Sequence, residues 1–156
     1  MSLTPHSTKP PLHTQNCDAE LRGCDVSSET GSAVGVEGGA PTLAGCTLHG
    51  TPRNGVAIFG DLETGECGCT LSGCTIAGNK LAGVLVRDGA APSVLDCDVS
   101  RNGGWGIDLR DCGGEYRGNR VAGNGRGALA YALLAEGVTP AALASGNSLD
   151  APPRPG

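Results

Sequence analysis

Apolar residues recur along the chain at fixed distances from six anchor positions, which are 22 to 28 residues apart. The first four anchors are cysteines and the last two are asparagines. Around each of the first five anchors, an apolar or aromatic residue stands three positions before it and two, ten and twelve positions after it. A chain that is 38% hydrophobic would not fill twenty such positions by chance. The anchors are Cys24, Cys46, Cys74, Cys97, Asn119 and Asn147.

Within each repeat, these positions alternate with polar neighbours, which is the period of a β-strand with one buried face. No segment repeats apolar residues at helical spacing over three turns, so the pattern does not favour helical repeats. Each repeat should contain at least two short strands, separated by turns that carry Asn and Gly. The four inward rows are Leu21, Leu43, Leu71, Val94 and Tyr116; Val26, Leu48, Ile76, Val99 and Val121; Val34, Val56, Val84, Ile107 and Leu129; and Val36, Ile58, Val86, Leu109 and Tyr131.

A repeat of about 22 residues with strand periodicity predicts a solenoid. Leucine-rich repeats do not fit because the L-x-x-L-x-L core is missing, and a propeller blade needs about twice the length. A left-handed β-helix would need strict hexapeptides. We therefore predict an all-β, right-handed parallel β-helix of five to six coils, in which like residues stack about 4.8 Å apart.

In such a helix the anchor cysteines form an inward ladder of small apolar groups. Asparagines recur five positions after the central anchors, and Asn both tolerates turn conformations and bonds to neighbouring amides. In the central repeats, a glycine directly precedes the apolar residue that stands ten positions after the anchor (the plus-ten row). A side chain at this glycine would collide with the next coil. The residues in question are Asn79, Asn102 and Asn124, and Gly55, Gly83 and Gly106.

Two segments, 73–92 (GCTIAGNKLAGVLVRDGAAP) and 96–111 (DCDVSRNGGWGIDLRD), resemble repeats of the pectate-lyase-like superfamily of parallel β-helices. The resemblance covers residues 17–131, with a weaker echo at 144–149. It implies the β-helix fold and a link to carbohydrate binding or sugar hydrolysis. Similar repeats also occur in phage spikes, ubiquitin-ligase substrate receptors and structural proteins, so the resemblance is specific for fold and not for activity.

Two insertions interrupt the rhythm of the repeat. The first is acidic, and surface loops of this kind often carry function. In the second, Thr139 is a candidate N-cap and Pro140 the first residue of a short helical turn. The domain plan is a Pro-rich N-terminal arm at 1–16, the β-helix at 17–149 with insertions at 59–70 and 132–143, and a C-terminal tail at 150–156.

The composition narrows the choice of partners and surroundings. The formal charge is −5 and the pI is near 5.0, which argues against nucleic acid or an anionic membrane as the main partner. The first 16 residues contain no apolar stretch typical of a secretory signal, and no stretch approaches the length of a membrane span. We therefore expect a cytoplasmic protein.

A group of charged residues on the last strand of two repeats is the strongest candidate for chemistry. If the chain is a polysaccharide lyase or glycoside hydrolase, paired carboxylates here would act as acid and base. The alternative, which we favour, is a surface ladder of alternating charge that solvates the sheet. The coils are few, aromatic platforms for sugars are scarce and no lysine lies nearby. The candidates are Arg87, Asp88, Asp108, Arg110 and Asp111.

The cysteines outside the ladder raise the question of a metal site. Cys67, Cys69 and Cys74 are close in sequence, but one C-x-C pair without a second pair of ligands is a weak zinc signal. We expect no metal and no cofactor. We expect free thiols, with the ladder cysteines protected and Cys67 or Cys69 reacting first.

Two functions remain open on this evidence. The favoured one is a non-catalytic structural or protein-interaction module, a rigid scaffold within a larger assembly; a cytoskeletal or ciliary assembly is one example that no motif singles out. The alternative is a carbohydrate-active enzyme. We expect protein partners, or a second copy, along a lateral face or at the N-terminal end, where the coil with Leu21, Cys24 and Val26 lacks a cap. Residues 132–146 should cap the C-terminal end.

Overall fold

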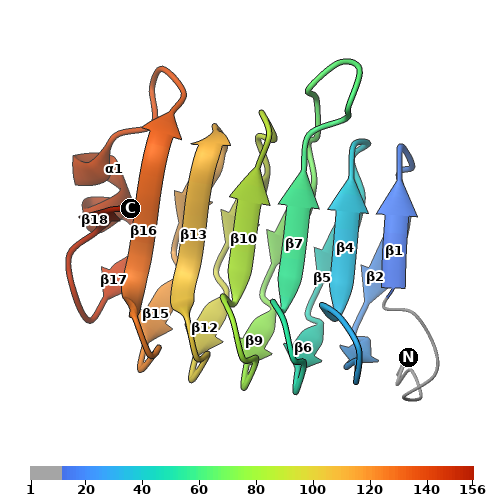
Figure 1. Ribbon diagram of the computed structural model, residues 1–156, viewed down its shortest axis with the longest axis horizontal. Helices are drawn as coiled ribbons and strands as arrows, with labels where there is room; N and C mark the ends of the chain where they lie inside the picture. The colour runs from blue at the N-terminus through green and yellow to red at the C-terminus, as the bar shows by residue number, and fades with distance from the viewer. Residues whose placement is uncertain (1–11) are drawn as a thin grey trace.

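The computed structural model describes residues 12–156, which wind into a parallel β-solenoid (Figure 1). Three parallel sheets run along it, and each of the first five coils contributes one strand to each sheet. The seven-stranded sheet contains, in order, β1 (Leu12–Gln15), β4 (Val34–Glu37), β7 (Val56–Phe59), β10 (Val84–Arg87), β13 (Trp105–Cys112), β16 (Gly127–Leu134) and β18 (Arg154–Pro155). The five-stranded sheet contains β2 (Glu20–Arg22), β5 (Thr42–Ala44), β8 (Thr70–Ser72), β11 (Ser93–Leu95) and β14 (Glu115–Arg117). The six-stranded sheet contains β3 (Asp25–Val26), β6 (Thr47–His49), β9 (Thr75–Ala77), β12 (Asp98–Ser100), β15 (Arg120–Ala122) and β17 (Ser148–Leu149).

The predicted parallel β-helix is confirmed, and so is its register. Val84 pairs with Val56 on one side and Ile107 on the other, as the repeat alignment requires. All three side chains are fully buried. The core is therefore a stack of small aliphatic layers, which explains how a chain with 3% aromatic residues forms one.

A row of asparagines forms a hydrogen-bonded ladder inside one turn of the solenoid. The Nδ2 of Asn79 donates to the Oδ1 of Asn102 at 2.9 Å, and the Nδ2 of Asn102 donates to the Oδ1 of Asn124 at 2.9 Å. Thr51 extends the ladder, its hydroxyl donating to Asn79 at 2.9 Å. Buried amides that satisfy one another in this way fix the height of each coil relative to the next.

The glycines before the plus-ten row are required for steric reasons. A Cβ on Gly83 would lie 2.5 Å from Cγ1 of Val99, and one on Gly106 would lie 2.3 Å from Cγ1 of Val121. Both contacts are far shorter than van der Waals separation. At these positions the chain lies directly against the six-stranded sheet of the following coil, and only glycine fits there.

Both ends of the solenoid extend further than the sequence pattern indicated. The estimate of five to six coils is too low, because the largest sheet is seven strands deep. Leu12–Gln15, assigned to the N-terminal arm, form β1 and pair with β4. The C-terminal tail is not free either, since Arg154 and Pro155 pair with β16. Residues 1–11 of the predicted arm lie outside the described residues.

The apolar side chains of the first coil are buried to different extents. Cys24 and Val26 are buried, whereas Leu12 and Leu21 are only partly buried. The hydroxyl of Thr14 is buried and has no hydrogen-bond partner among residues 12–156. The expectation that another chain completes this end also concerns residues 1–11, so it stays a prediction.

A short helix, α1 (Pro140–Gly146), covers the C-terminal end as expected. The hydroxyl of Thr139 accepts a hydrogen bond from the Ala142 amide at 3.1 Å, which confirms the predicted N-cap. Leu143 is 3% exposed and packs into the core beside β14 and β17. The insertion is shorter than expected, because residues 132–134 continue β16. Within residues 12–156, no helix is long and apolar enough to cross a membrane.

The acidic insertion is a loop of residues 60–69 between β7 and β8, because Phe59 and Thr70 belong to the flanking strands. It rises beyond the end of β7 (Figure 1). We call residues 60–66 of this segment the acidic loop. Its C-terminal part returns to the solenoid, where Cys67 and Cys69 are buried in the core.

Candidate binding cleft on the seven-stranded sheet

One row of turn residues leads into the outer surface of the seven-stranded sheet. Arg53, Leu81, Gly104 and Arg126 stand seven positions after successive anchors. Backbone hydrogen bonds join them in that order, with N···O distances of 3.0, 2.9 and 3.0 Å. The stacking of the coils therefore brings two arginines from distant parts of the sequence to the same edge of the sheet.

The strands add further charged residues to the same surface. Leu85 on β10 lies beside Asp108 on β13, and both alternate with inward-facing core residues. Arg87 and Arg110 follow two positions later on the same strands, so they also face outward. Together with the turn row they surround a cleft of about 340 Å³. We call it the arginine cleft; its lining includes Arg53, Leu81, Leu85, Arg87, Trp105, Asp108, Arg110 and Arg126.

The carboxylate of Asp108 is already engaged within the cleft. Arg110 donates to it through Nε at 3.1 Å and through Nη2 at 3.3 Å. The Asp108 side chain is 12% exposed, whereas that of Arg110 is 49% exposed. A carboxylate held in this way serves as an internal counter-ion, because both of its oxygens accept hydrogen bonds from a neighbouring cation.

Trp105 is the one aromatic residue of the cleft, and a neighbouring cation covers it. The guanidinium of Arg126 lies 5.6 Å from the ring centroid, a cation–π distance. The ring leans over Gly127, where a Cβ would come within 2.6 Å of its edge. The indole therefore serves to position Arg126 and offers less open ring surface for stacking on a sugar.

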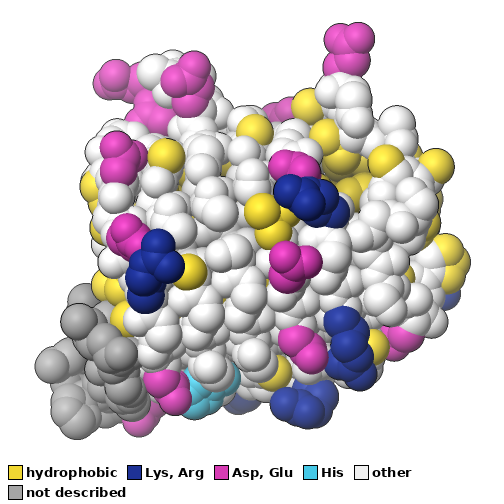
Figure 2. Space-filling model, turned by 180° about the vertical axis from the view of Figure 1, so that it is seen from behind, with side chains coloured by type: hydrophobic (Ala, Val, Ile, Leu, Met, Phe, Trp, Pro, Cys, Tyr) yellow, Lys and Arg dark blue, Asp and Glu magenta, His cyan; other side chains and the backbone are white. Residues whose placement is uncertain are grey.

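The arginine cleft is strongly cationic in a molecule whose formal charge is −5. Four arginines line it against one aspartate. Arg53 and Arg87 are exposed and make no ion pair within residues 12–156. On the rear of the molecule, acidic and basic side chains lie as neighbours (Figure 2). On the six-stranded sheet, Asp98 and Arg120 form an ion pair at 3.2 Å. Arg53 and Arg87 thus place two unpaired positive charges together in one cleft.

The two other candidate carboxylates, Asp88 and Asp111, do not line the arginine cleft. Each has a left-handed backbone, with φ of 59° and 48°; Asp88 lies in the turn after β10, and Asp111 lies near the end of β13. Asp tolerates this conformation better than most residues. The five predicted charged residues are therefore divided: Arg87, Asp108 and Arg110 meet in the cleft, and the other two lie outside it, near the C-terminal ends of β10 and β13.

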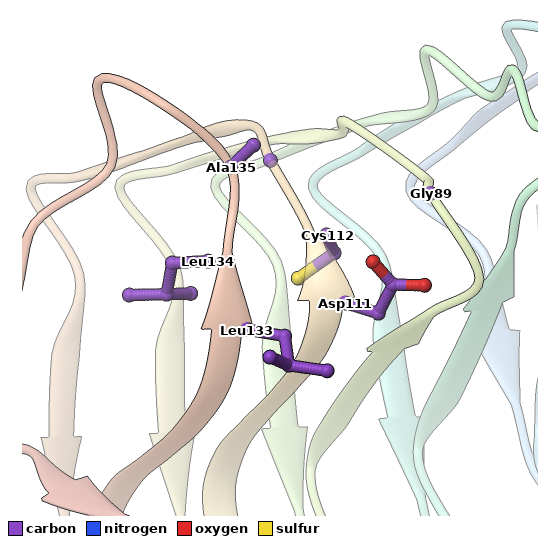
Figure 3. Close-up of a pocket in the computed structure, with 7 residues that line it drawn as sticks. Gly89, Asp111, Cys112, Leu133, Leu134 and Ala135 are labelled. Carbon is purple, nitrogen blue, oxygen red and sulfur yellow. The ribbon is translucent and has the colours of Figure 1, made fainter.

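Asp111 lines a separate hollow of about 350 Å³ at the ends of β13 and β16, together with Cys112 and Leu133 (Figure 3). In this view the carboxylate of Asp111 and the sulfur of Cys112 point in opposite directions. Burial raises the pKa of the Cys112 thiol, and burial likewise holds the pKa of Tyr116 well above its usual value. A protonated thiol is a poor nucleophile, so this hollow does not combine a nucleophile with a base.

The remaining cysteines correct one expectation. Cys67 and Cys69 are 5% and 0% exposed, so the prediction that one of them reacts first is wrong. Burial raises the pKa of both thiols. The better exposed thiol is that of Cys17. All eight cysteines are free thiols, and residues 12–156 contain no cluster of three or more His, Cys, Asp or Glu side chains suited to a metal ion.

Arg53, Leu81 and Arg126 were missed as candidates because they stand in turns, where strand alternation says nothing about direction. Their common offset of seven residues from the anchors was the available signal. Any side chains at equal offsets in successive coils lie in one row. Aligning the turns as well as the strands would have found them.

Comparison with known proteins agrees with this architecture. The family model described as "Right handed beta helix region" matches residues 12–147. This chain belongs to that family of right-handed β-helices, in accord with the resemblance of its repeats. No curated protein and no solved structure matches the chain.

Proposed function

We propose that the chain is a non-catalytic protein-interaction module, a rigid β-helical scaffold subunit that binds its partner through the arginine cleft. The observation that carries this proposal is the unpaired positive charge of Arg53 and Arg87, which line a cleft on the outer surface of the stacked strands. Charged residues on a fixed scaffold steer association and select the partner. An acidic surface is the complement that this cleft fits.

The carbohydrate-active alternative is less well supported by the same geometry. Glycoside hydrolysis generally needs two carboxylates that flank the scissile bond. The arginine cleft contains one, Asp108, and Arg110 holds it. Asp88 and Asp111 lie outside the cleft, and Arg126 covers the Trp105 ring.

The cysteines favour a reducing compartment for this scaffold. Eight free thiols, seven of them buried, suit the cytoplasm better than an oxidising environment. We accordingly place the protein in the cytoplasm, as part of a larger assembly, where a rod of stacked coils offers long lateral surfaces.

The proposal is tested by photo-crosslinking from the cleft. A photo-reactive residue replaces Leu85 in the cleft, or Leu95 on the five-stranded sheet as the matched control, in cells of the source organism. We expect a discrete protein adduct from position 85, absent from position 95 and lost when Arg53 and Arg87 are both changed to Glu. Equal labelling from both positions would contradict the proposal. So would turnover of a polysaccharide that the Asp108→Asn substitution abolishes.

A further inference from the structure

The acidic loop presents an apolar tip between negative charges. Leu62 is 86% exposed, the most exposed large hydrophobic residue that the structure describes. Glu63 and Glu66 are exposed next to it and form no ion pair among residues 12–156. The tip therefore offers one apolar side chain and two unpaired carboxylates, a combination that a surface with an apolar centre and basic groups around it would complement.

The loop is held in one conformation by its own hydrogen bonds. Asp61 accepts bonds from the amides of Glu63 and Thr64, both at 2.9 Å, and these bonds lower the pKa of its carboxyl group. The amide of Gly65 donates to the carbonyl of Asp61 at 2.7 Å. A loop ordered in advance loses little entropy when it docks, so a small contact can be effective.

The arginine cleft is complementary to this tip in two independent respects. Leu81, Leu85 and the edge of Trp105 provide an apolar lining for one leucine side chain. Arg53 and Arg87 provide two unpaired positive charges for two glutamates. Apolar contact at the centre with opposite charges at the rim is the arrangement of a specific protein interface.

The loop does not fill the cleft of its own chain. The amide of Gly60 bonds to the carbonyl of Arg87 at 3.2 Å, and the amide of Asp61 bonds to that of Glu66 at 3.0 Å, which fixes the loop where β7 ends. It rises beyond the strands there (Figure 1), while Arg53 and Leu81 lie in the turns that precede β7 and β10. The complement of the cleft is therefore available from another copy.

We infer that the acidic loop of one molecule docks into the arginine cleft of a second copy of this chain, with Leu62 as the apolar anchor. The inference rests on the proposed function and names one occupant of the cleft. The two contact surfaces differ, so the contact is heterologous. Such contacts repeat from one molecule to the next and build rings or open chains.

Sedimentation velocity of the full chain tests the inference through a charge exchange. The loop variant carries Glu63→Arg and Glu66→Arg, and the cleft variant carries Arg53→Glu and Arg87→Glu. The control carries Lys80→Glu and Arg101→Glu, two exposed residues that do not line the cleft. Each protein is measured over a range of concentrations at about 10 mM and about 500 mM salt, with circular dichroism to verify folding.

We expect the unmodified chain and the control to associate at low salt and to dissociate at high salt. The loop variant alone and the cleft variant alone should remain monomeric, because each brings like charges together. An equimolar mixture of the two should associate again, because every contact between a loop of one variant and a cleft of the other then joins opposite charges. A Leu62→Asn chain should associate at least tenfold more weakly.

Two results would overturn the inference: an unmodified chain that stays monomeric at low salt, or a mixture of folded variants that does not regain association. These results leave the wider proposal to its own test. If the chain is monomeric but the photo-reactive residue at position 85 captures a different protein in an arginine-dependent way, the cleft is a docking surface and only its occupant is wrong. Equal labelling from positions 85 and 95 contradicts the wider proposal itself.

Discussion

Val84 shows at the residue scale how sharply the solenoid separates inside from outside. It lies between Val56 and Ile107 and is fully buried. Val84→Asp would bury a carboxylate without a partner, so we expect a loss of several kcal/mol in unfolding free energy, comparable to the stability of a small domain. Leu95→Asp, on an outward position beside Arg117, should cost less than about 1 kcal/mol. Urea unfolding measures both, and equal losses would mean that the register is wrong.

Thiol reactivity gives a second test at the residue scale. Cys17 is the partly exposed cysteine, whereas Cys67 and Cys69 are buried and burial raises their pKa values. Because the thiolate is the reactive form, we expect iodoacetamide to modify Cys17 first in the native protein. The other seven cysteines should react only after denaturation. Peptide mass spectrometry follows the order of labelling, and early modification of Cys67 would place that segment outside the core.

The asparagine ladder is the element that ties successive coils together. Asn102 donates to Ile76, Ser100 and Asn124, and its Oδ1 accepts from Asn79. Asn102→Ala would leave several buried polar groups without partners, at about 1–3 kcal/mol each, so we expect a loss of at least about 3 kcal/mol.

Asn54 is the matched control for this prediction. It lies in a turn, is partly exposed and accepts one bond from the amide of Ala82 at 3.0 Å. Asn54→Ala should cost about 1 kcal/mol. Thermal and urea unfolding compare the two variants, and a loss at position 102 no larger than at position 54 would mean that the ladder does not stabilise the stack.

The helix α1 is the element that caps the C-terminal end. Leu143 is 3% exposed and packs on the last coil, whereas Leu133, near the end of β16, is 80% exposed. We expect Leu143→Ala to lower the unfolding free energy by about 2–5 kcal/mol. Leu133→Ala should change it by less than about 0.5 kcal/mol. Equal effects of the two substitutions would show that α1 does not cover the core.

At the scale of the whole molecule, the repeat alone predicted the fold and most of the core. Its limit lay at the two ends, where β1 carries Thr14 and β18 carries Pro155 at positions that are apolar or aromatic in the other coils. An end strand pairs on one side only, so its inward residue packs against one neighbouring coil in place of two. The pattern fades there although the strand persists.

The site was harder to predict than the fold for a different physical reason. Alternation along a strand correctly placed Arg87, Asp108 and Arg110 outward, but it does not say which charges pair. The Asp108–Arg110 contact depends on side-chain conformation, and Arg53 and Arg126 come from turns. A cleft made from several coils is a property of the stack and appears only when all the coils are aligned.

The central claim is that the stacked coils place the four arginines of the cleft on one surface. Distances between spin labels test this claim most directly. Outward positions Gln15, Glu37, Arg110 and Ala132 follow one row of the seven-stranded sheet, in its first, second, fifth and sixth strands. Pairs of labels at 37 and 110, at 37 and 132, and at 15 and 132 should be separated by about 14, 19 and 24 Å, a rise of about 4.8 Å per coil. Pulsed electron paramagnetic resonance measures the longer separations and continuous-wave line broadening the shortest. Distances that fail to increase by one coil spacing from pair to pair would contradict the stacked surface and the cleft built on it.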